Sequence, residues 1–174
     1  MMSVRKACPN DLAALTAIYE ETHTLEEQGM TATGWIRGVY PTGETARRAI
    51  EEGEMYVLEE DGVIAACARF NRHQEDVYAL VPWQTPAEPD EVLVMHTLVV
   101  SPAHRGRGCA HAFAAWYEEE ARRLGCRALR IDTNARNAAA RRLYASLGYR
   151  ESAIVPCKFN GIPDVALVCL EKSL

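Results

Sequence analysis

The chain has 174 residues, 48% of them apolar and 25% charged, and its 19 Lys and Arg against 24 Asp and Glu give a formal net charge of −5. This composition is typical of one soluble globular domain, and an acidic chain without a basic run argues against a nucleic-acid partner. No apolar stretch approaches the roughly 18 residues that a membrane span needs. The first seven residues lack the apolar core of a signal peptide, and no two cysteines form a C-x-x-C pair. We therefore expect a single cytoplasmic domain over residues 1–174, with reduced thiols and no metal.

The hydrophobic pattern predicts strands and helices along the whole chain. A strand over 3–6 precedes a helix over 11–27, with Asn10 as its N-cap, and Thr42 caps a second helix that ends before Gly53. Two strands, 55–59 and 63–70, flank the hairpin signal Asp61-Gly62. After an irregular connection over 71–90, we expect a strand (92–100), a helix (108–124), a strand (128–131), a helix (138–147) and two final strands (149–155 and 165–170). This order predicts an α+β or mixed α/β fold.

The turn between the strand at 92–100 and the helix at 108–124 carries the clearest chemical signal. No Asp, Ser, Thr or Asn stands at the N-cap, and Arg105 and Arg107 add positive charge at the positive end of the helix dipole. Both features are explained if an external anion binds the free N–H groups beside the glycines. The alternative is a solvated basic turn. The segment has no Lys for a phosphate-binding loop of the Walker type, and His111 departs from the dinucleotide fingerprint.

Two blocks of sequence resemble the GNAT superfamily of acetyltransferases. Arg105-Gly106-Arg107-Gly108-Cys109-Ala110 matches its [QR]-x-x-G-x-[GA] signature, and Asn137-x-x-Ala140-x-x-Leu143-Tyr144-x-x-x-Gly148-Tyr149 is similar to a second family segment. The resemblance implies a mixed α/β fold with a central, mostly antiparallel sheet of about six to seven strands and helices on both faces. It also implies acetyl-CoA as the anion, with no metal.

The resemblance further implies which residues bind acetyl-CoA. The pyrophosphate would lie on the turn formed by Arg105, Gly106, Arg107, Gly108, Cys109 and Ala110, and the pantetheine arm would bond to the backbones of Leu98, Val99 and Val100. Asn137 would contact the same arm, and Tyr144 would protonate the departing CoA thiolate as general acid. Two alternatives stay open, because Asn137 also suits a plain N-cap and Tyr144 also suits core packing.

The general base and the acceptor are less well specified by the sequence. His96 is the first candidate base, because its ordinary pKa of about 6.5 suits the removal of a proton from an amine, and Glu91 or a water relay is the second. A histidine on a strand face is equally often structural. The segments that would line the acceptor cleft contain six aromatic and amide side chains: Trp35, Tyr40, Asn71, Gln74, Tyr78 and Trp83. These aromatic residues could equally hold loops against the sheet.

The sequence therefore predicts an acetyl-CoA-dependent N-acetyltransferase. A primary amine, on a small molecule or a peptide, would attack the thioester directly in a ternary complex, since no cysteine has a histidine partner at an identifiable spacing. The alternative is a non-catalytic sensor domain that binds acyl-CoA. The identity of the amine, the length of the acyl chain and a homodimeric state are left open.

Overall fold

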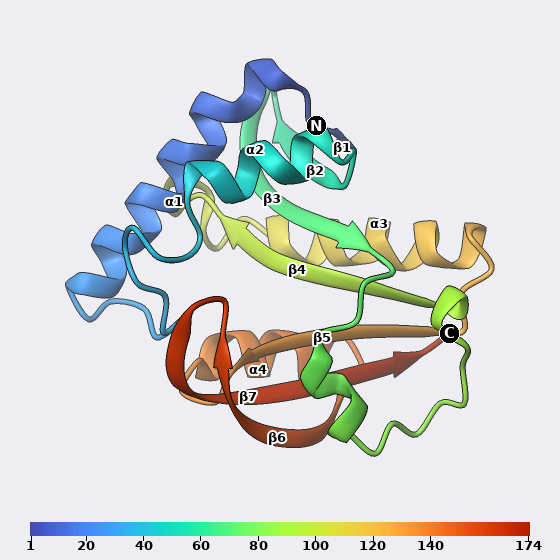
Figure 1. The fold of residues 1–174 in the computed structure, drawn as a ribbon. Coiled ribbons are helices and arrows are strands. Elements are labelled where there is room, and N and C mark those ends of the chain that lie inside the picture. The colour runs from blue at the N-terminus through green and yellow to red at the C-terminus, as the bar shows by residue number, and fades with distance from the viewer.

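The computed structural model describes residues 1–174 and contains one seven-stranded sheet with four helices. The strands are β1 (Met2–Lys6), β2 (Met55–Glu60), β3 (Val63–Asn71), β4 (Val92–Val100), β5 (Ala128–Asn134), β6 (Arg150–Phe159) and β7 (Ile162–Ser173). The helices are α1 (Leu12–Glu27), α2 (Gly43–Glu51), α3 (Cys109–Arg123) and α4 (Ala138–Ser146). The strand order is β1-β2-β3-β4-β5-β7-β6, and every neighbouring pair is antiparallel except β4 and β5 (Figure 1).

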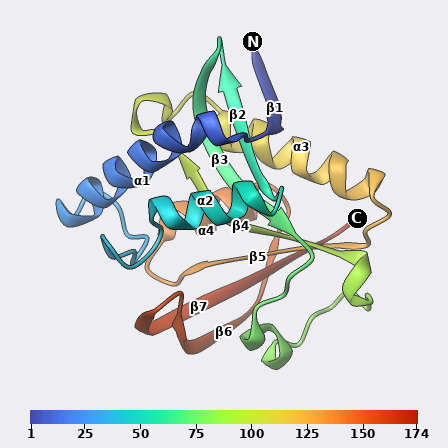
Figure 2. The ribbon, with the colours of Figure 1, turned by 45° about the horizontal axis from the view of Figure 1, so that its top comes forward.

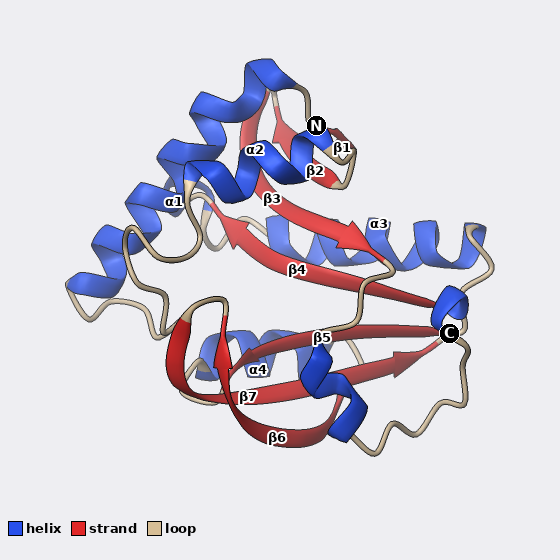
Figure 3. Cartoon of the chain, in the orientation of Figure 1, coloured by secondary structure: helices blue, strands red, loops and turns tan.

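The helices cover both faces of the sheet (Figures 2 and 3). On one face, Leu15 of α1 and Ala46 of α2 pack in one cluster with Val57 of β2. On the other face, Phe113 of α3 and Tyr144 of α4 join the cluster that contains alternate residues of β4 and β5. Burial of both faces explains why β3 and β4 are apolar almost throughout. The predicted mixed α/β fold with a mostly antiparallel sheet and helices on both faces is confirmed.

The two parallel strands at the centre of the sheet separate along their length. Residues of β4 and β5 pair only from Val92 with Ala128 to Met95 with Ile131. Beyond that point β4 stays paired with β3 through a β-bulge at Thr97, whose φ is +55°. A bulge bends a strand and increases its twist, and in Figure 1 the carboxyl ends of β4 and β5 diverge. The segment after Met95 therefore has an edge that no neighbouring strand occupies.

Several boundaries differ from those that the sequence predicts. A 3-10 turn over Pro9–Asp11 precedes α1, so Asp11 takes the N-cap position in place of Asn10, and its carboxylate binds Arg5 and the backbone N–H of Cys8. The connection over 71–90 contains a short 3-10 helix, Asp76–Leu80. β5 and β7 extend several residues beyond the predicted limits, because they pair with each other from Ala128 to Asn134. No helix combines the length and the apolar character needed to cross a membrane.

Candidate active site

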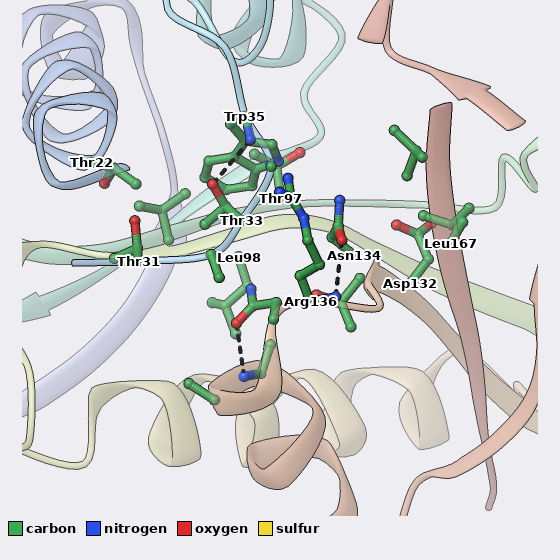
Figure 4. Close-up of a pocket in the computed structure, with 18 of the residues that line it drawn as sticks. Thr22, Thr31, Thr33, Trp35, Thr97, Leu98, Asp132, Asn134, Arg136 and Leu167 are labelled. Atoms are coloured by element: carbon green, nitrogen blue, oxygen red, sulfur yellow. Dashed lines mark hydrogen bonds between the residues drawn. The ribbon is translucent and has the colours of Figure 1, made fainter. Parts of the chain in front are cut away.

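A cavity of about 590 Å³ lies where β4 and β5 separate. Its walls come from both strands, the loop between α1 and α2, the first turns of α4 and the β6–β7 hairpin (Figure 4). None of the six cysteines lines it. Nine of the predicted site residues do line it: Trp35, Tyr40, His96, Leu98, Val99, Val100, Arg105, Asn137 and Tyr144. The structure thus brings together residues from four separate segments of the chain.

The turn before α3 has the features that an anion site requires. Gly108 is the N-cap of α3 with a φ of +83°, no side chain caps the helix, and the space beside Gly106 and Gly108 is open. Arg105 is exposed, reaches the cavity and makes no ion pair, whereas Arg107 lies 3.2 Å from Glu60. Free helix N–H groups and an unpaired guanidinium both favour a bound phosphate.

The thiol of Cys109, at the start of α3, lies in an environment typical of a structural rather than a reactive cysteine. The Cys109 side chain is buried, its Sγ lies 3.7 Å from the carbonyl oxygen of His104, and burial raises its pKa. A thiol with a raised pKa is a poor nucleophile. Cys109 and Ala110 therefore contribute backbone N–H groups to the turn, and their side chains lie outside the cavity.

The first turns of α4 bring Asn137 and Tyr144 to the cavity. The Asn137 side-chain oxygen accepts a hydrogen bond from the Ala140 N–H at 3.1 Å, so it caps α4. The Tyr144 hydroxyl makes no hydrogen bond within the chain, although its ring is almost fully buried in the core cluster. Burial and the nearby charge of Asp132 raise the pKa of Tyr144 well above its usual value. Tyr144 therefore holds its proton beside the cavity.

His96 lies on β4 with both ring nitrogens facing oxygen atoms. Its Nε2 is 2.8 Å from Oδ1 of Asn71, and its Nδ1 is 3.4 Å from Oε1 of Glu75. The same Asn71 oxygen accepts the backbone N–H of His73, so Nε2 of His96 must be a donor. The bond to His96 also lowers the pKa of Glu75. Both ring nitrogens of His96 therefore lie against oxygen atoms of the chain itself.

A carboxylate that sequence reasoning passed over, Asp132, lines the cavity from β5. Side chains alternate along a strand, so Asp132 points to the face opposite Ile131, which packs against α3 and α4. Burial raises the pKa of Asp132 to about 6, and the Tyr78 hydroxyl donates to it at 2.7 Å. Tyr144 and Asp132 thus approach the open edge of β4 from opposite faces of the sheet. The sequence pattern that could have identified Asp132 is an acidic residue directly after the predicted strand 128–131.

The remaining predicted acid or base, Glu91, lies away from the cavity. It precedes β4, at the end of that strand opposite to the separation from β5. Its carboxylate accepts the N–H of Glu88 at 2.9 Å and lies 3.7 Å from Arg127.

Four of the six residues predicted to line the cleft for the amine substrate also lie outside the cavity. Asn71 lines a smaller neighbouring pocket of about 90 Å³ together with His96. Gln74, Tyr78 and Trp83 belong to the connection over 71–90 and bind side chains or backbone of the sheet and of that connection. Trp35 and Tyr40 remain at the cavity, where the Tyr40 hydroxyl bonds to that of Thr97.

The acidic side chain of Glu26 organises the loop between α1 and α2. Its carboxylate accepts hydrogen bonds from Thr31, Thr33 and the N–H of Gly34 at 2.7 to 2.9 Å. Burial raises the pKa of Glu26, but these bonds outweigh that effect and leave its pKa below the usual value. Gly34 lies so close to Asn134 that an added Cβ would stand 2.4 Å from its amide nitrogen. The loop therefore crosses the open end of β5 and covers the cavity.

No group of three or more His, Cys, Asp or Glu side chains is arranged to hold a metal ion. The functional groups around the cavity are thus a tyrosine, a carboxylate, an arginine turn and free backbone N–H groups. These groups suit transfer of an acyl group from a phosphate-bearing donor.

Comparison with known proteins identifies the family. The model of the acetyltransferase (GNAT) family matches residues 13–149. The L-methionine sulfoximine/L-methionine sulfone acetyltransferase of Salmonella typhimurium is 29% identical over 177 residues, which cover 98% of this chain and 94% of that protein. The aminoalkylphosphonate N-acetyltransferase of the same organism is 40% identical over 55 residues, 32% of this chain and 36% of that one.

Solved structures agree. A GNAT-family acetyltransferase from Streptococcus agalactiae superposes with a TM-score of 0.84 at 24% identity, over 99% of this chain and 95% of that one. YncA from Salmonella typhimurium, solved with its cofactor acetyl-CoA, has a TM-score of 0.70 at 25% identity, over 99% and 94%. The chain belongs to the GNAT family of acetyl-CoA-dependent acetyltransferases.

Proposed function

We propose that this enzyme acetylates the primary amine of a small molecule that also carries an anionic group. The observation that carries the proposal is the separation of β4 from β5, with Tyr144 on one face of the opening and Asp132 on the other. The proton donor and the proton acceptor are then held apart, on the two sides of an acetyl-CoA molecule bound at the edge of β4. The absence of a cysteine from the cavity wall favours direct transfer in a ternary complex.

Acetyl-CoA supplies the activated acetyl group and a thiolate leaving group. The N–H groups before α3 and Arg105 would hold its pyrophosphate, and the unpaired edge of Leu98, Val99 and Val100 would hold its pantetheine arm. A backbone N–H on that edge would donate to the thioester carbonyl oxygen, which gains negative charge as the amine attacks. Asn137 keeps its side-chain N–H₂ free for the same arm.

Two protons must move during the transfer. As the new C–N bond forms, the amine loses a proton, and as the C–S bond breaks, the sulfur gains one from the Tyr144 hydroxyl. The geometry favours Asp132 over His96 as the acceptor of the amine proton, directly or through a water, because both nitrogens of His96 are occupied. A carboxylate whose pKa is about 6 is ionised at neutral pH and is a stronger base than an ordinary one.

The acceptor side offers one cation without a partner. Arg136 lines the cavity beside Asn134 and Gly34, and its guanidinium makes no hydrogen bond or ion pair within the chain (Figure 4). Such a group suits a carboxylate or phosphonate on the acceptor. Amino acid derivatives and aminoalkylphosphonates, the acceptors named for the two relatives, both combine an amine with such an anion.

Release of free CoA thiol, measured across a panel of amines, tests this function. The panel contains L-methionine sulfone, L-methionine sulfoximine, an aminoalkylphosphonate and the amine that methionine sulfone would give on losing its carboxylate. We expect Arg136→Gln to raise KM at least tenfold for the acceptors that carry a carboxylate or phosphonate and to leave KM for the amine without one unchanged. The matched control is Arg142→Gln, on the exposed side of α4.

Three results would overturn parts of the proposal. Binding of acetyl-CoA without thiol release from any amine would favour a sensor domain. An equal rise of KM for acceptors with and without the anionic group would remove Arg136 from acceptor recognition. Asp132→Asn should abolish an ionisation near pH 6 in kcat/KM and His96→Gln should retain it, so the opposite pattern would return the role of base to His96.

A further inference from the structure

The hydroxyl group of Tyr78 makes a partly buried hydrogen bond that the proposed reaction does not by itself explain. Tyr78 lies on the short 3-10 helix Asp76–Leu80, is 2% exposed, and donates to Oδ2 of Asp132 at 2.7 Å. The two residues are 54 positions apart in the chain. The Tyr78 hydroxyl therefore binds one oxygen of the carboxylate and leaves the other available to the cavity.

The segment that carries Tyr78 is held against the sheet by a buried ion pair. Arg130 donates to Glu171 at 3.0 Å, and both side chains are nearly inaccessible to solvent. Glu171 in turn accepts the backbone N–H groups of Gln84 and Thr85. These contacts hold residues 84–85 of the segment 71–90 against β7 and, through the ion pair, against β5.

Trp83 links this ion pair to Tyr78. Its ring lies 4.2 Å from the guanidinium carbon of Arg130, and its Nε1 donates to the Tyr78 carbonyl oxygen at 2.9 Å. The rings of Trp83 and Tyr78 also make an edge-on contact, with centroids 5.1 Å apart. Because Arg130 and Asp132 are two residues apart on β5, they share one face. Tyr78 is thus supported next to the residue that it contacts.

We propose that Tyr78 is a positioning residue for acetyl transfer, which orients the Asp132 carboxylate toward the opening between β4 and β5. This inference rests on the proposed function, in which Asp132 takes the proton of the amine. Its basis is the chain of contacts from the buried Arg130–Glu171 pair through the partly buried Trp83 to the Tyr78 hydroxyl. The connection over 71–90 is then part of the active site, although it does not line the cavity.

The groups around Asp132 determine what loss of this bond should do. Burial raises the pKa of Asp132, the Tyr78 bond and the charge of His96 lower it, and Glu75 raises it. The other titratable groups that face it are Tyr144 from α4, Tyr40 from the α1–α2 loop, Cys169 from β7 and Cys157 from β6. All four are neutral at pH 7, since their pKa values are raised. Removal of the Tyr78 hydroxyl should therefore raise the pKa of Asp132.

The variant Tyr78→Phe removes only the hydroxyl. Its effect can be read directly from a carbon-13 NMR titration of the Asp132 carboxyl, with the signal assigned by its loss in Asp132→Asn. We expect the midpoint to move from about pH 6 to about 7, because a hydrogen bond to a charged group is worth about one pKa unit or more. The acidic limb of kcat/KM should move with it, so that activity at pH 6 falls about fivefold and recovers above pH 8.

The matched control is Tyr117→Phe. Tyr117 is fully buried on the opposite face of the sheet, and its hydroxyl donates to the Leu93 carbonyl oxygen at 2.6 Å. This variant should lose a similar amount of stability and leave the Asp132 midpoint and the pH profile in place.

The outcomes separate this inference from the proposed function. An unchanged carboxyl midpoint in Tyr78→Phe, or the same shift in Tyr117→Phe, would overturn the inference whatever the activity. A shifted midpoint with an unshifted kcat/KM profile would remove Tyr78 and Asp132 from the reaction while acetyl transfer itself stands. A wild-type protein that acetylates no amine would refute the proposed function, and with it the catalytic part of this inference.

Discussion

Replacement of Asp132 by asparagine should make the protein more stable at neutral pH. Burial raises the pKa of this carboxyl from 3.8 to about 6 in the folded state. Each pKa unit corresponds to about 1.4 kcal/mol, so the ionised carboxylate costs about 3 kcal/mol of folding free energy above pH 6. An asparagine has nearly the same shape, can still accept the bond from Tyr78 and carries no charge.

The difference between the folded-state and unfolded-state pKa of Asp132 determines how the gain in stability depends on pH. Below about pH 3 the carboxyl is protonated in both the folded and the unfolded state, so it contributes no difference, and at pH 4 the difference is still small. As the pH rises from 4 to 6, the unfolded state ionises first and the wild-type protein loses stability. The gain in the free energy of unfolding of Asp132→Asn over the wild type should therefore be small at pH 4 and reach about 3 kcal/mol at pH 7.

Thermal unfolding followed by circular dichroism at pH 4, 5, 6 and 7 measures this directly. For a chain of this size, 3 kcal/mol corresponds to a rise in Tm of about 6 to 12 °C at pH 7. Asp164→Asn is the matched control, because Asp164 is exposed on β7 and makes no ion pair. A Tm difference that is absent at pH 7, or that is equally large at pH 4, would refute the reasoning from burial.

Three further predictions follow from the site and its support. Tyr144→Phe should lower kcat about 100-fold and change the KM for acetyl-CoA less than about twofold, and an unchanged kcat would assign Tyr144 to packing alone. Glu171→Gln leaves the buried Arg130 without its charge partner, so we expect a loss of about 3 to 5 kcal/mol and a fall in Tm of about 6 to 20 °C in the same unfolding assay. Arg105→Gln should weaken acetyl-CoA binding about tenfold in calorimetry and Arg107→Gln less, because only Arg107 already pairs with Glu60; equal losses would contradict this.

Much of the fold and of the proposed donor site could be predicted from the sequence because those features are local. A helix start without a cap, flanked by Gly106, Gly108 and Arg105, can be recognised within ten residues. Apolar periodicity likewise placed the four helices and the seven strands within a few residues of their observed limits. The start of the first helix is an exception, since a 3-10 turn over Pro9–Asp11 moves the N-cap of α1 to Asp11, whose carboxylate binds Arg5.

The candidate proton-transfer groups depend on the tertiary structure. His96 looks available in the sequence, but the sheet places Asn71 and Glu75 against its two nitrogens. Asp132 looks like an ordinary strand end, but the separation of β4 and β5 exposes it to a cavity, and burial raises its pKa. The sequence predicts that Tyr78 either lines the acceptor cleft or holds its loop against the sheet, and in the structure its hydroxyl binds Asp132.

The sequence by itself determined the family, the order of the elements and the uncapped, arginine- and glycine-containing turn before α3, because backbone propensity and helix capping act over a few neighbouring residues. Only the tertiary structure decided which carboxylate lines the cavity and which residues contact it. That choice depends on strand order and on the bulge at Thr97, which opens β4 from β5 and brings residues more than 50 positions apart into contact. Burial at that opening then alters the pKa of Asp132, an effect that no local pattern records.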